Sequence, residues 1–69
     1  MSTTIEIVDE FIKLGDLLKF SGYTITGGEA KIMITRGGVK VNGEIVTERG
    51  RKIKRGDVVV MDIGEIVVV

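Results

Sequence analysis

The chain has 69 residues, which is enough for one small domain that buries roughly 60% of its unfolded surface. Its apolar fraction of 43% and charged fraction of 29% are typical of a folded globular protein. Cysteine and histidine are absent, which excludes a disulfide framework, the usual zinc sites and catalysis by thiol or imidazole groups. We therefore expect a single domain over residues 1–69 with no catalytic residues, no metal and no cofactor.

Further classes of protein are excluded by missing sequence patterns. No apolar run approaches the roughly 20 residues of a membrane span, and no signal-peptide pattern opens the chain. No carboxylates have the spacing of a calcium loop, and there is no phosphate-binding loop with Gly-Lys-Ser/Thr. We expect a cytoplasmic protein that is not an enzyme and has no membrane partner.

Charge is unevenly distributed along the chain, although the formal net charge is zero. The segment from Lys31 to Arg55 holds eight basic and two acidic residues, a local net charge of +6, and the remaining residues balance it. Segregated charge on a short chain tends to give a polarised surface, whose local field matters more to a polyanion than the total charge. The distribution therefore predicts a surface that attracts a polyanion.

The first half of the chain predicts a strand followed by two helices. Alternating residues in "TIEIVDEF" indicate a short strand. In "FIKLGDLLKFSGY", the leucines within residues 14–18 share one helical face, and Gly22 is placed to end that helix. In "TGGEAKIMITRGG", Thr26 and Glu29 form a capping box that starts a second helix, and two glycines end it. The helices are expected to form an antiparallel or angled pair.

The second half predicts strands. "VKV", Asn42-Gly43 and "EIV" indicate a hairpin with a type I′ turn, in which the valines face one side and Lys40 the other. "VVVMDI" and "GEIVVV" indicate two more strands around a turn at Gly64, and the first and last strands are able to pair. The expected fold class is α+β, with two short helices packed on a small, mostly antiparallel β-sheet.

This order of motifs resembles the RNA-binding domain named after small-subunit ribosomal protein S-four. The resemblance covers residues 11–61 and rests on "KLGDLLKFSG", "EAKIMITRGGVKVNGEIV" and "IKRGDVVV", with the terminal strands flanking this core. "TGGEAK" together with the "RGRK" loop is similar to the short stand-alone proteins of the YaaA/YbcJ-like subgroup, which carry no catalytic domain. The family implies RNA binding, commonly to structured ribosomal or transfer RNA.

Two positions depart from the family's pattern. Thr26-Gly27 stands where the family usually has Ser-Arg, which removes one expected RNA contact. Gly15 stands where an aspartate commonly follows the first leucine. These departures leave the affinity and the target open.

The basic side chains are the candidate RNA contacts, because lysines and arginines that neutralise phosphates release counterions and produce salt-dependent binding. The second helix and the hairpin adjoin at Gly37-Gly38, so their basic residues and those of the following loop are predicted to converge on one surface. The predicted RNA-binding residues are Lys13, Lys31, Arg36, Lys40, Arg49, Arg51, Lys52 and Lys54.

Several of these residues also have a purely structural interpretation. Arg36 interacts favourably with the helix dipole whether or not RNA is present, and Lys40 is able to pair across the strands with Glu44 or a neighbour. Lys19 is more simply a solvated side chain. The sequence leaves open whether Lys54 and Arg55 face the same surface.

The apolar residues outside the helical stripes raise separate questions. Phe11 is expected in the core. Phe20 and Tyr23 are each able to stack on an unpaired base, although packing against the sheet is the favoured role. Ile32 is expected to be exposed, which could mark a protein contact.

The predicted function is non-catalytic binding of structured RNA by a monomer. The second helix, the hairpin and the basic loop would dock on ribosomal RNA or a ribosome precursor, within a ribosomal particle, or on transfer RNA. The alternative is a small protein–protein interaction adaptor that pairs its edge strands with another chain. Binding that weakens steeply with salt favours RNA, whereas salt-insensitive binding favours the adaptor.

Overall fold

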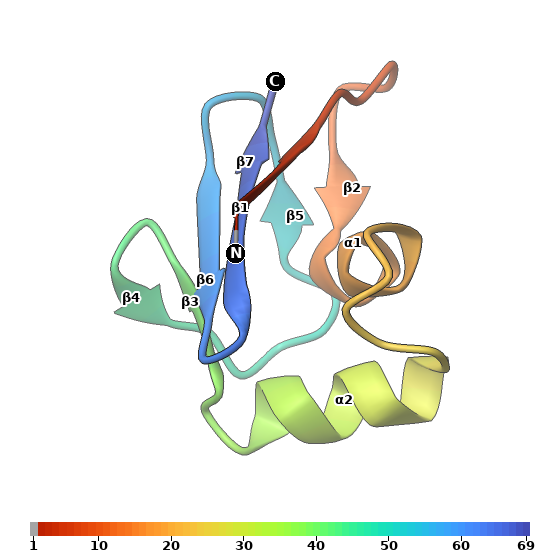
Figure 1. Cartoon of the computed structure of the whole chain (residues 1–69), viewed down its shortest axis with the longest axis vertical. Coiled ribbons are helices and arrows are strands. Elements are labelled where there is room, and N and C mark those ends of the chain that lie inside the picture. The colour runs from red at the N-terminus through yellow and green to blue at the C-terminus, as the bar shows by residue number, and fades with distance from the viewer. Residues whose placement is uncertain (1) are drawn as a thin grey trace.

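Two helices pack against one face of a five-stranded sheet in the computed structural model, which describes residues 2–69 (Figure 1). The elements in chain order are β1 Ser2–Ile5, β2 Ile12–Lys13, α1 Leu14–Phe20, α2 Gly27–Thr35, β3 Val39–Val41, β4 Glu44–Ile45, β5 Lys52–Ile53, β6 Val58–Met61 and β7 Gly64–Val68. None of the described helices is long and apolar enough to span a bilayer.

The large sheet has the strand order β1-β7-β6-β3-β4. All of its neighbouring strands are antiparallel except β1 and β7, which run parallel and tie the two ends of the described chain together. The predicted α+β class with a mostly antiparallel sheet is confirmed, as is the pairing of the first and last strands. The turn predicted at Gly64 lies earlier, at Asp62 and Ile63, because Met61 already pairs with Gly64.

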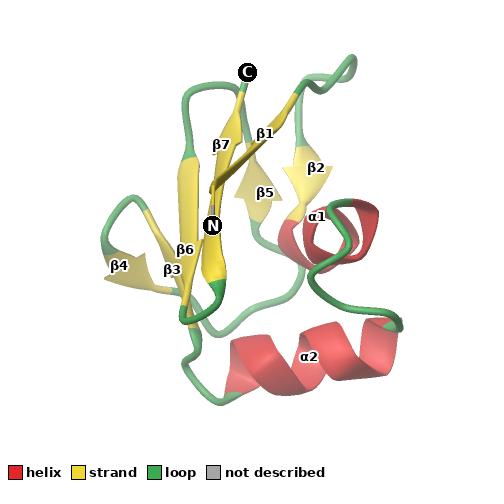
Figure 2. Ribbon diagram, viewed as in Figure 1, coloured by secondary structure: helices red, strands yellow, loops and turns green. Residues whose placement is uncertain are grey.

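A separate ribbon of two antiparallel strands, β2 and β5, lies beside α1 (Figure 2). Sequence patterns did not predict it, because two residues are too few to show a period. On the side of the ribbon that faces the core, Ile12 lies opposite Ile53, which is fully buried. The ribbon thereby fixes the loop that precedes β5, which holds Arg49 and Arg51 and is called the basic loop, against the start of α1.

Helix α2 begins and ends where its sequence signals predicted, whereas α1 begins at Leu14, later than the pattern that starts at Phe11, because Ile12 and Lys13 pair with β5. The buried face of α1 consists of leucines, and Gly22 follows the helix with a φ of +85°. At the start of α2, the Thr26 hydroxyl accepts a hydrogen bond of 3.1 Å from the Glu29 amide, while Ala30 and Ile34 face the core. Gly37, with a φ of +79°, ends the helix. A left-handed φ favours glycine at both helix ends.

One hydrogen-bonded network joins the Asn42-Gly43 turn to the Gly56-Asp57 turn. Asn42 and Gly43 have φ angles of +51° and +87°, as the predicted type I′ turn requires. The Asn42 side chain donates to an Asp57 carboxylate oxygen at 3.0 Å and accepts from the Val58 amide at 2.9 Å. The other Asp57 oxygen accepts from the Lys54 amide at 2.8 Å. The Asn-Gly and Gly-Asp motifs therefore form one structural unit.

The pKa of Asp57 reflects this network. Partial burial acts to raise the pKa, but hydrogen bonds from the Lys54 amide and the Asn42 side chain, together with the charges of Arg51 and Lys54, outweigh it. The pKa of the Asp57 carboxyl is therefore lowered from its ordinary value. The carboxylate form is the one that holds the two turns together.

Candidate nucleic-acid interface

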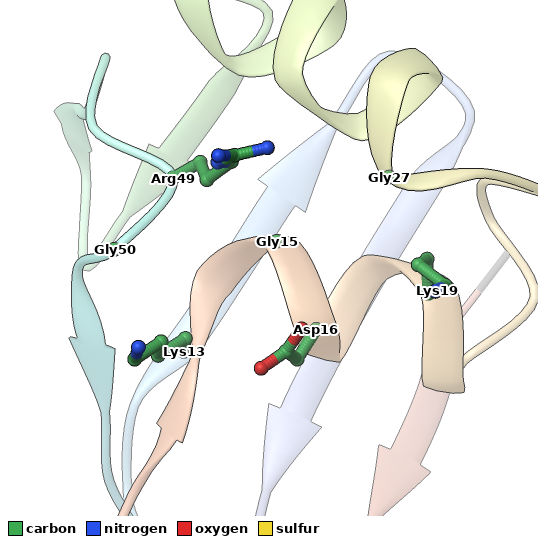
Figure 3. A pocket seen from close by; sticks show the side chains of 7 residues that line it. All are labelled: Lys13, Gly15, Asp16, Lys19, Gly27, Arg49 and Gly50. Carbon is green, nitrogen blue, oxygen red and sulfur yellow. The ribbon is translucent and has the colours of Figure 1, made fainter.

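A pocket of about 420 Å³ opens between the start of α1, the start of α2 and the loop before β5 (Figure 3). Its lining consists of Lys13, Gly15, Asp16, Lys19, Gly27, Arg49 and Gly50. Three cationic side chains face one carboxylate, and all four are exposed to solvent. We call this site the basic pocket.

Backbone hydrogen bonds hold the basic loop against α1. Lys13 precedes the helix without a side-chain cap, so its first amides need other partners. The Leu14 amide donates to the Arg51 carbonyl at 2.8 Å, and the Gly15 amide donates to the Arg49 carbonyl at 3.0 Å. The loop thus caps the helix, and the Arg49 side chain extends between α1 and α2 (Figure 3).

Gly15 allows this close approach. A Cβ atom at Gly15 would lie 3.2 Å from Cγ of Arg49 and 3.5 Å from its carbonyl oxygen. A glycine inside a helix costs about 1 kcal/mol relative to alanine, so its presence has to be explained by such a contact. The departure from the family's aspartate at this position therefore has a structural reason, since a larger side chain would displace Arg49.

The ribbon places two lysines directly opposite each other. Lys13 and Lys52 are register partners in the antiparallel pair β2 and β5. Nζ of Lys52 lies 4.9 Å from the centroid of the Phe11 ring, a cation–π contact that keeps the ammonium group on the outer side of the ribbon. Like charges directly opposite each other on neighbouring strands are destabilising. An anion bound beside them would relieve this repulsion.

The start of α2 adds further positive potential to the basic pocket. Gly27 is the first residue of the helix and lines the basic pocket. The first turn of a helix has amides without intrahelical partners, and its dipole favours negative charge. Gly27 has no side chain that would cover its amide. The pocket therefore combines exposed cationic side chains with a positive helix end.

The predicted residues do not all converge. Lys13 and Arg49 line the basic pocket, and Lys52 lies opposite Lys13. Arg36 is the C-terminal cap residue of α2, so it lies at the other end of that helix from Gly27. It lines a different hollow together with Glu29, Ile32, Met33, Gly38 and Asp62. The structure therefore does not bring Arg36 into the basic pocket, and a surface shared by Arg36 and the basic loop stays a prediction.

Lys40 lies away from both hollows, on the face of the sheet opposite the buried Val39 and Val41. Its register partners are Ile45 on β4 and Val60 on β6. Glu44 instead lies opposite Val41, so the hairpin register does not place it directly across from Lys40, as the alternative interpretation required.

The remaining predicted cations are exposed. Lys31 lies on α2, where its carbonyl accepts from the Thr35 hydroxyl at 2.8 Å. Arg51 and Lys54 flank β5. Arg55 differs, because its guanidinium donates to the Ile7 carbonyl at 2.7 Å and so joins the turn before β6 to the N-terminal segment. The Arg55 side chain therefore has a hydrogen-bond partner within the fold. Among the described contacts the Lys54 side chain has none, because it is the backbone amide of Lys54 that donates to Asp57.

Five pocket residues were not among the predicted contacts: Gly15, Asp16, Lys19, Gly27 and Gly50. The available signal was the spacing of residues 13, 16 and 19, since positions three apart share one face of a helix. The aromatic predictions also need correction. Phe11 is only partly buried, and Phe20 is 69% exposed instead of packed on the sheet. The packing role of Tyr23 is confirmed, because its hydroxyl lies 3.1 Å from that of Thr3.

Comparison with known proteins places these features in a family. A family model for the S4 domain matches residues 5–69. YbcJ of Escherichia coli is 44% identical over 48 residues, which cover 70% of this chain and 69% of YbcJ. RlbA of Bacillus subtilis, named a probable ribosome maturation protein, is 42% identical over 59 residues, which cover 86% of this chain and 83% of RlbA.

The fold agrees with these sequence matches. The solution structure of YbcJ, described as revealing a motif involved in RNA binding, matches with a TM-score of 0.65 and 33% identity over 96% of this chain and 85% of that one. Tyrosine–tRNA ligase of Nitrosomonas europaea is 41% identical over 59 residues. That match spans 86% of this chain but only 14% of the ligase. The chain belongs to the S4 domain family.

Proposed function

We propose that the chain binds structured RNA through the basic pocket and the adjoining ribbon of β2 and β5, and that it catalyses no reaction. The observation that carries the proposal is the unbalanced cation cluster: Lys13 lies opposite Lys52 and shares the pocket with Lys19 and Arg49. Repulsion within such a cluster lowers the stability of the free protein, and bound phosphates relieve that repulsion.

Ribosomal RNA or a ribosome precursor is the target that we propose first. RlbA, which matches over most of its length, is named for ribosome maturation, and the YbcJ structure is described in terms of RNA binding. Transfer RNA is the second candidate, because the domain also matches a small part of tyrosine–tRNA ligases. Shape and phosphate contacts fit structured RNA better than reading of base edges within a duplex does.

The non-catalytic part of the proposal rests on composition and on the relatives. A chain without histidine and cysteine lacks the commonest acid–base and nucleophilic groups. The two short relatives are named for RNA binding or ribosome maturation, and the match to the ligases covers 14% of those enzymes.

Salt dependence tests the proposal against the protein adaptor. Binding of the protein to purified ribosomal RNA, transfer RNA and a plain RNA duplex would be measured by filter retention at several salt concentrations. Three to four phosphate contacts predict an affinity loss of about 20-fold or more as salt rises from about 50 to about 200 mM. Salt-insensitive binding, or no binding to any of these RNAs, would overturn the proposal. Crosslinking in cell extract followed by sequencing of the attached RNA then identifies the target.

A further inference from the structure

Phe20 is an exposed aromatic side chain that the basic pocket does not use. It is the last residue of α1, lies off the buried leucine face and is 69% exposed. A large apolar side chain left in water at the end of a helix contributes little to the fold. It has the two properties that a base-stacking platform needs, which are an accessible ring and a rigid attachment.

The hollow next to Phe20 is continuous with the basic pocket. This open hollow of about 350 Å³ is lined by Ile12, Asp16, Lys19 and Phe20. Asp16 and Lys19 also line the basic pocket, so α1 presents both sites side by side. A nucleic acid whose phosphate lies in the pocket would therefore have its next group within reach of the Phe20 ring.

The chemistry of this hollow suits a base better than a second phosphate. The Asp16 carboxylate balances the single cation of this hollow, Lys19, so the hollow lacks the excess of cations that the basic pocket has, and the carboxylate accepts N–H groups from the edge of a base. Ile12 and Phe20 supply an apolar surface for the face of the base. Lys19 remains available to a neighbouring phosphate.

The other side of Phe20 has the opposite character. A hollow of about 210 Å³ there is lined by Glu6, Ile7, Val8, Asp9, Phe11, Ile12 and Phe20, with two carboxylates and no cation. Lys52 and Arg55 contact Phe11 and Ile7 of this lining, so their charges balance the two carboxylates and leave no excess of positive charge for a polyanion. The excess of cations lies on the side of the basic pocket, which favours the base of an RNA that leads from that pocket.

We infer that Phe20 stacks on an unpaired base of the same RNA whose phosphate occupies the basic pocket. The inference rests on the proposed function and narrows it: the preferred RNA has an unpaired nucleotide, such as a bulge, beside a paired segment. A fully paired base has no free face to offer to the ring.

Two RNA hairpins with the same stem and loop would test this inference. One carries a single-nucleotide bulge and the other is fully paired, and binding is measured by fluorescence anisotropy. Phe20→Ala is expected to weaken binding to the bulged hairpin by about tenfold or more and to leave the paired hairpin within about twofold. Phe20→Trp is expected to keep the preference for the bulge. Because the chain has no tryptophan, the fluorescence of this variant should be quenched by the bulged hairpin alone.

Arg49→Glu separates this inference from the proposed function. It is expected to weaken binding to both hairpins. If it does so while Phe20→Ala binds both hairpins like the wild type, RNA binding stands and the stacking role is overturned. Equal losses for both hairpins with Phe20→Ala also overturn it, as does a Phe20→Ala variant that keeps RNA binding but loses a protein partner. If Arg49→Glu weakens neither hairpin, the proposed site itself is overturned. Unchanged thermal unfolding of Phe20→Ala would show that losses do not come from misfolding.

Discussion

The two ends of α2 both lie beside an arginine, yet only the hollow at one end has an excess of positive charge. At the N-terminal end, three cations and one carboxylate surround the basic pocket. Arg36, at the C-terminal end, lines a hollow that extends along α2 to Glu29 in the first turn and that also contains the Asp62 carboxylate and apolar side chains. The helix dipole also favours anions at the first end and not at the second. We therefore expect a cation to serve RNA binding only where its neighbours leave its charge unbalanced.

Charge reversal at each end of α2 should give the largest contrast. We expect Lys13→Glu combined with Arg49→Glu to lower affinity for ribosomal RNA by about 100-fold at moderate salt, because two phosphate contacts become repulsive. The matched control is Arg36→Glu combined with Lys40→Glu, which makes the same change in net charge. Its expected loss is less than about tenfold. Filter binding measures both, and equal losses would show that only the total charge matters.

A turn that is distant from the pocket should affect stability without affecting RNA. Asp57→Ala leaves the Lys54 amide and the Asn42 side chain without their acceptor, and because both hydrogen bonds are exposed to water, the expected cost is about 0.5–1.5 kcal/mol of unfolding free energy. Urea unfolding measures this loss, and RNA affinity of the folded variant should stay within about twofold of the wild type. A double-mutant cycle with Asn42→Ala should be non-additive, and simple additivity would contradict the shared network.

Gly15→Ala should disturb the pocket with little effect on stability. The new Cβ would lie 3.2 Å from Cγ of Arg49, so we expect this side chain to move and RNA affinity to fall about three- to tenfold. The gain of up to about 1 kcal/mol from helix propensity should offset the crowding. Gly28→Ala is the control, since its Cβ would meet nothing closer than Thr26 Oγ1 at 3.9 Å. Unchanged RNA binding by Gly15→Ala would remove the proposed role of this glycine.

Lys52→Glu should change stability and binding in opposite directions. It replaces a like-charge pair with an opposite-charge pair across β2 and β5, which is expected to raise the unfolding free energy by about 0.2–1 kcal/mol in a Phe11→Ala background, where no cation–π contact of Lys52 is lost. RNA affinity should fall, because a cation next to the pocket is lost. Lys31→Glu, at an exposed position on α2, should leave stability within about 0.5 kcal/mol. If Lys52→Glu destabilises the Phe11→Ala protein, the account of the ribbon is contradicted.

The smallest expected effect is the pH dependence from Asp57. Its folded pKa is lowered from the ordinary value of 3.8, so the unfolded state binds the proton more tightly. The stabilisation by this carboxylate is therefore present above that value and lost as the pH falls through the lower folded pKa. Urea unfolding between neutral and acidic pH should show this loss in the wild type and a smaller one in Asp57→Asn. Identical pH profiles would contradict it.

Local signals predicted the elements that they specify completely. The leucines of α1, the Thr26 cap of α2 and the Asn42-Gly43 turn each act within a few residues, and the structure contains all three. The ribbon of β2 and β5 was missed, because its two-residue strands are held by partners about 40 positions away in the sequence. Without the ribbon, nothing in the sequence brings Lys13 next to Lys52.

The residues of the candidate site could likewise be predicted only in part from local sequence patterns. Lys13 and Arg49 were predicted from charge and family resemblance, and the structure places both in the basic pocket. Lys19 was interpreted as a solvated side chain and Phe20 as a packed one, since neither role can be separated from its alternative without knowing what lies beside α1. Their positions depend on tertiary contacts that no local pattern contains.

Amide chemical-shift mapping by NMR tests the central claim most directly, and a chain of 69 residues suits the method. The bulged RNA hairpin described above would be titrated into the labelled protein at moderate salt. The account predicts that the largest shifts cluster at residues 13–20, 27–29 and 49–52. Shifts that cluster instead at Arg36, Lys40 and Ile45 would contradict it, because they would place RNA on the end of α2 where the charges are balanced.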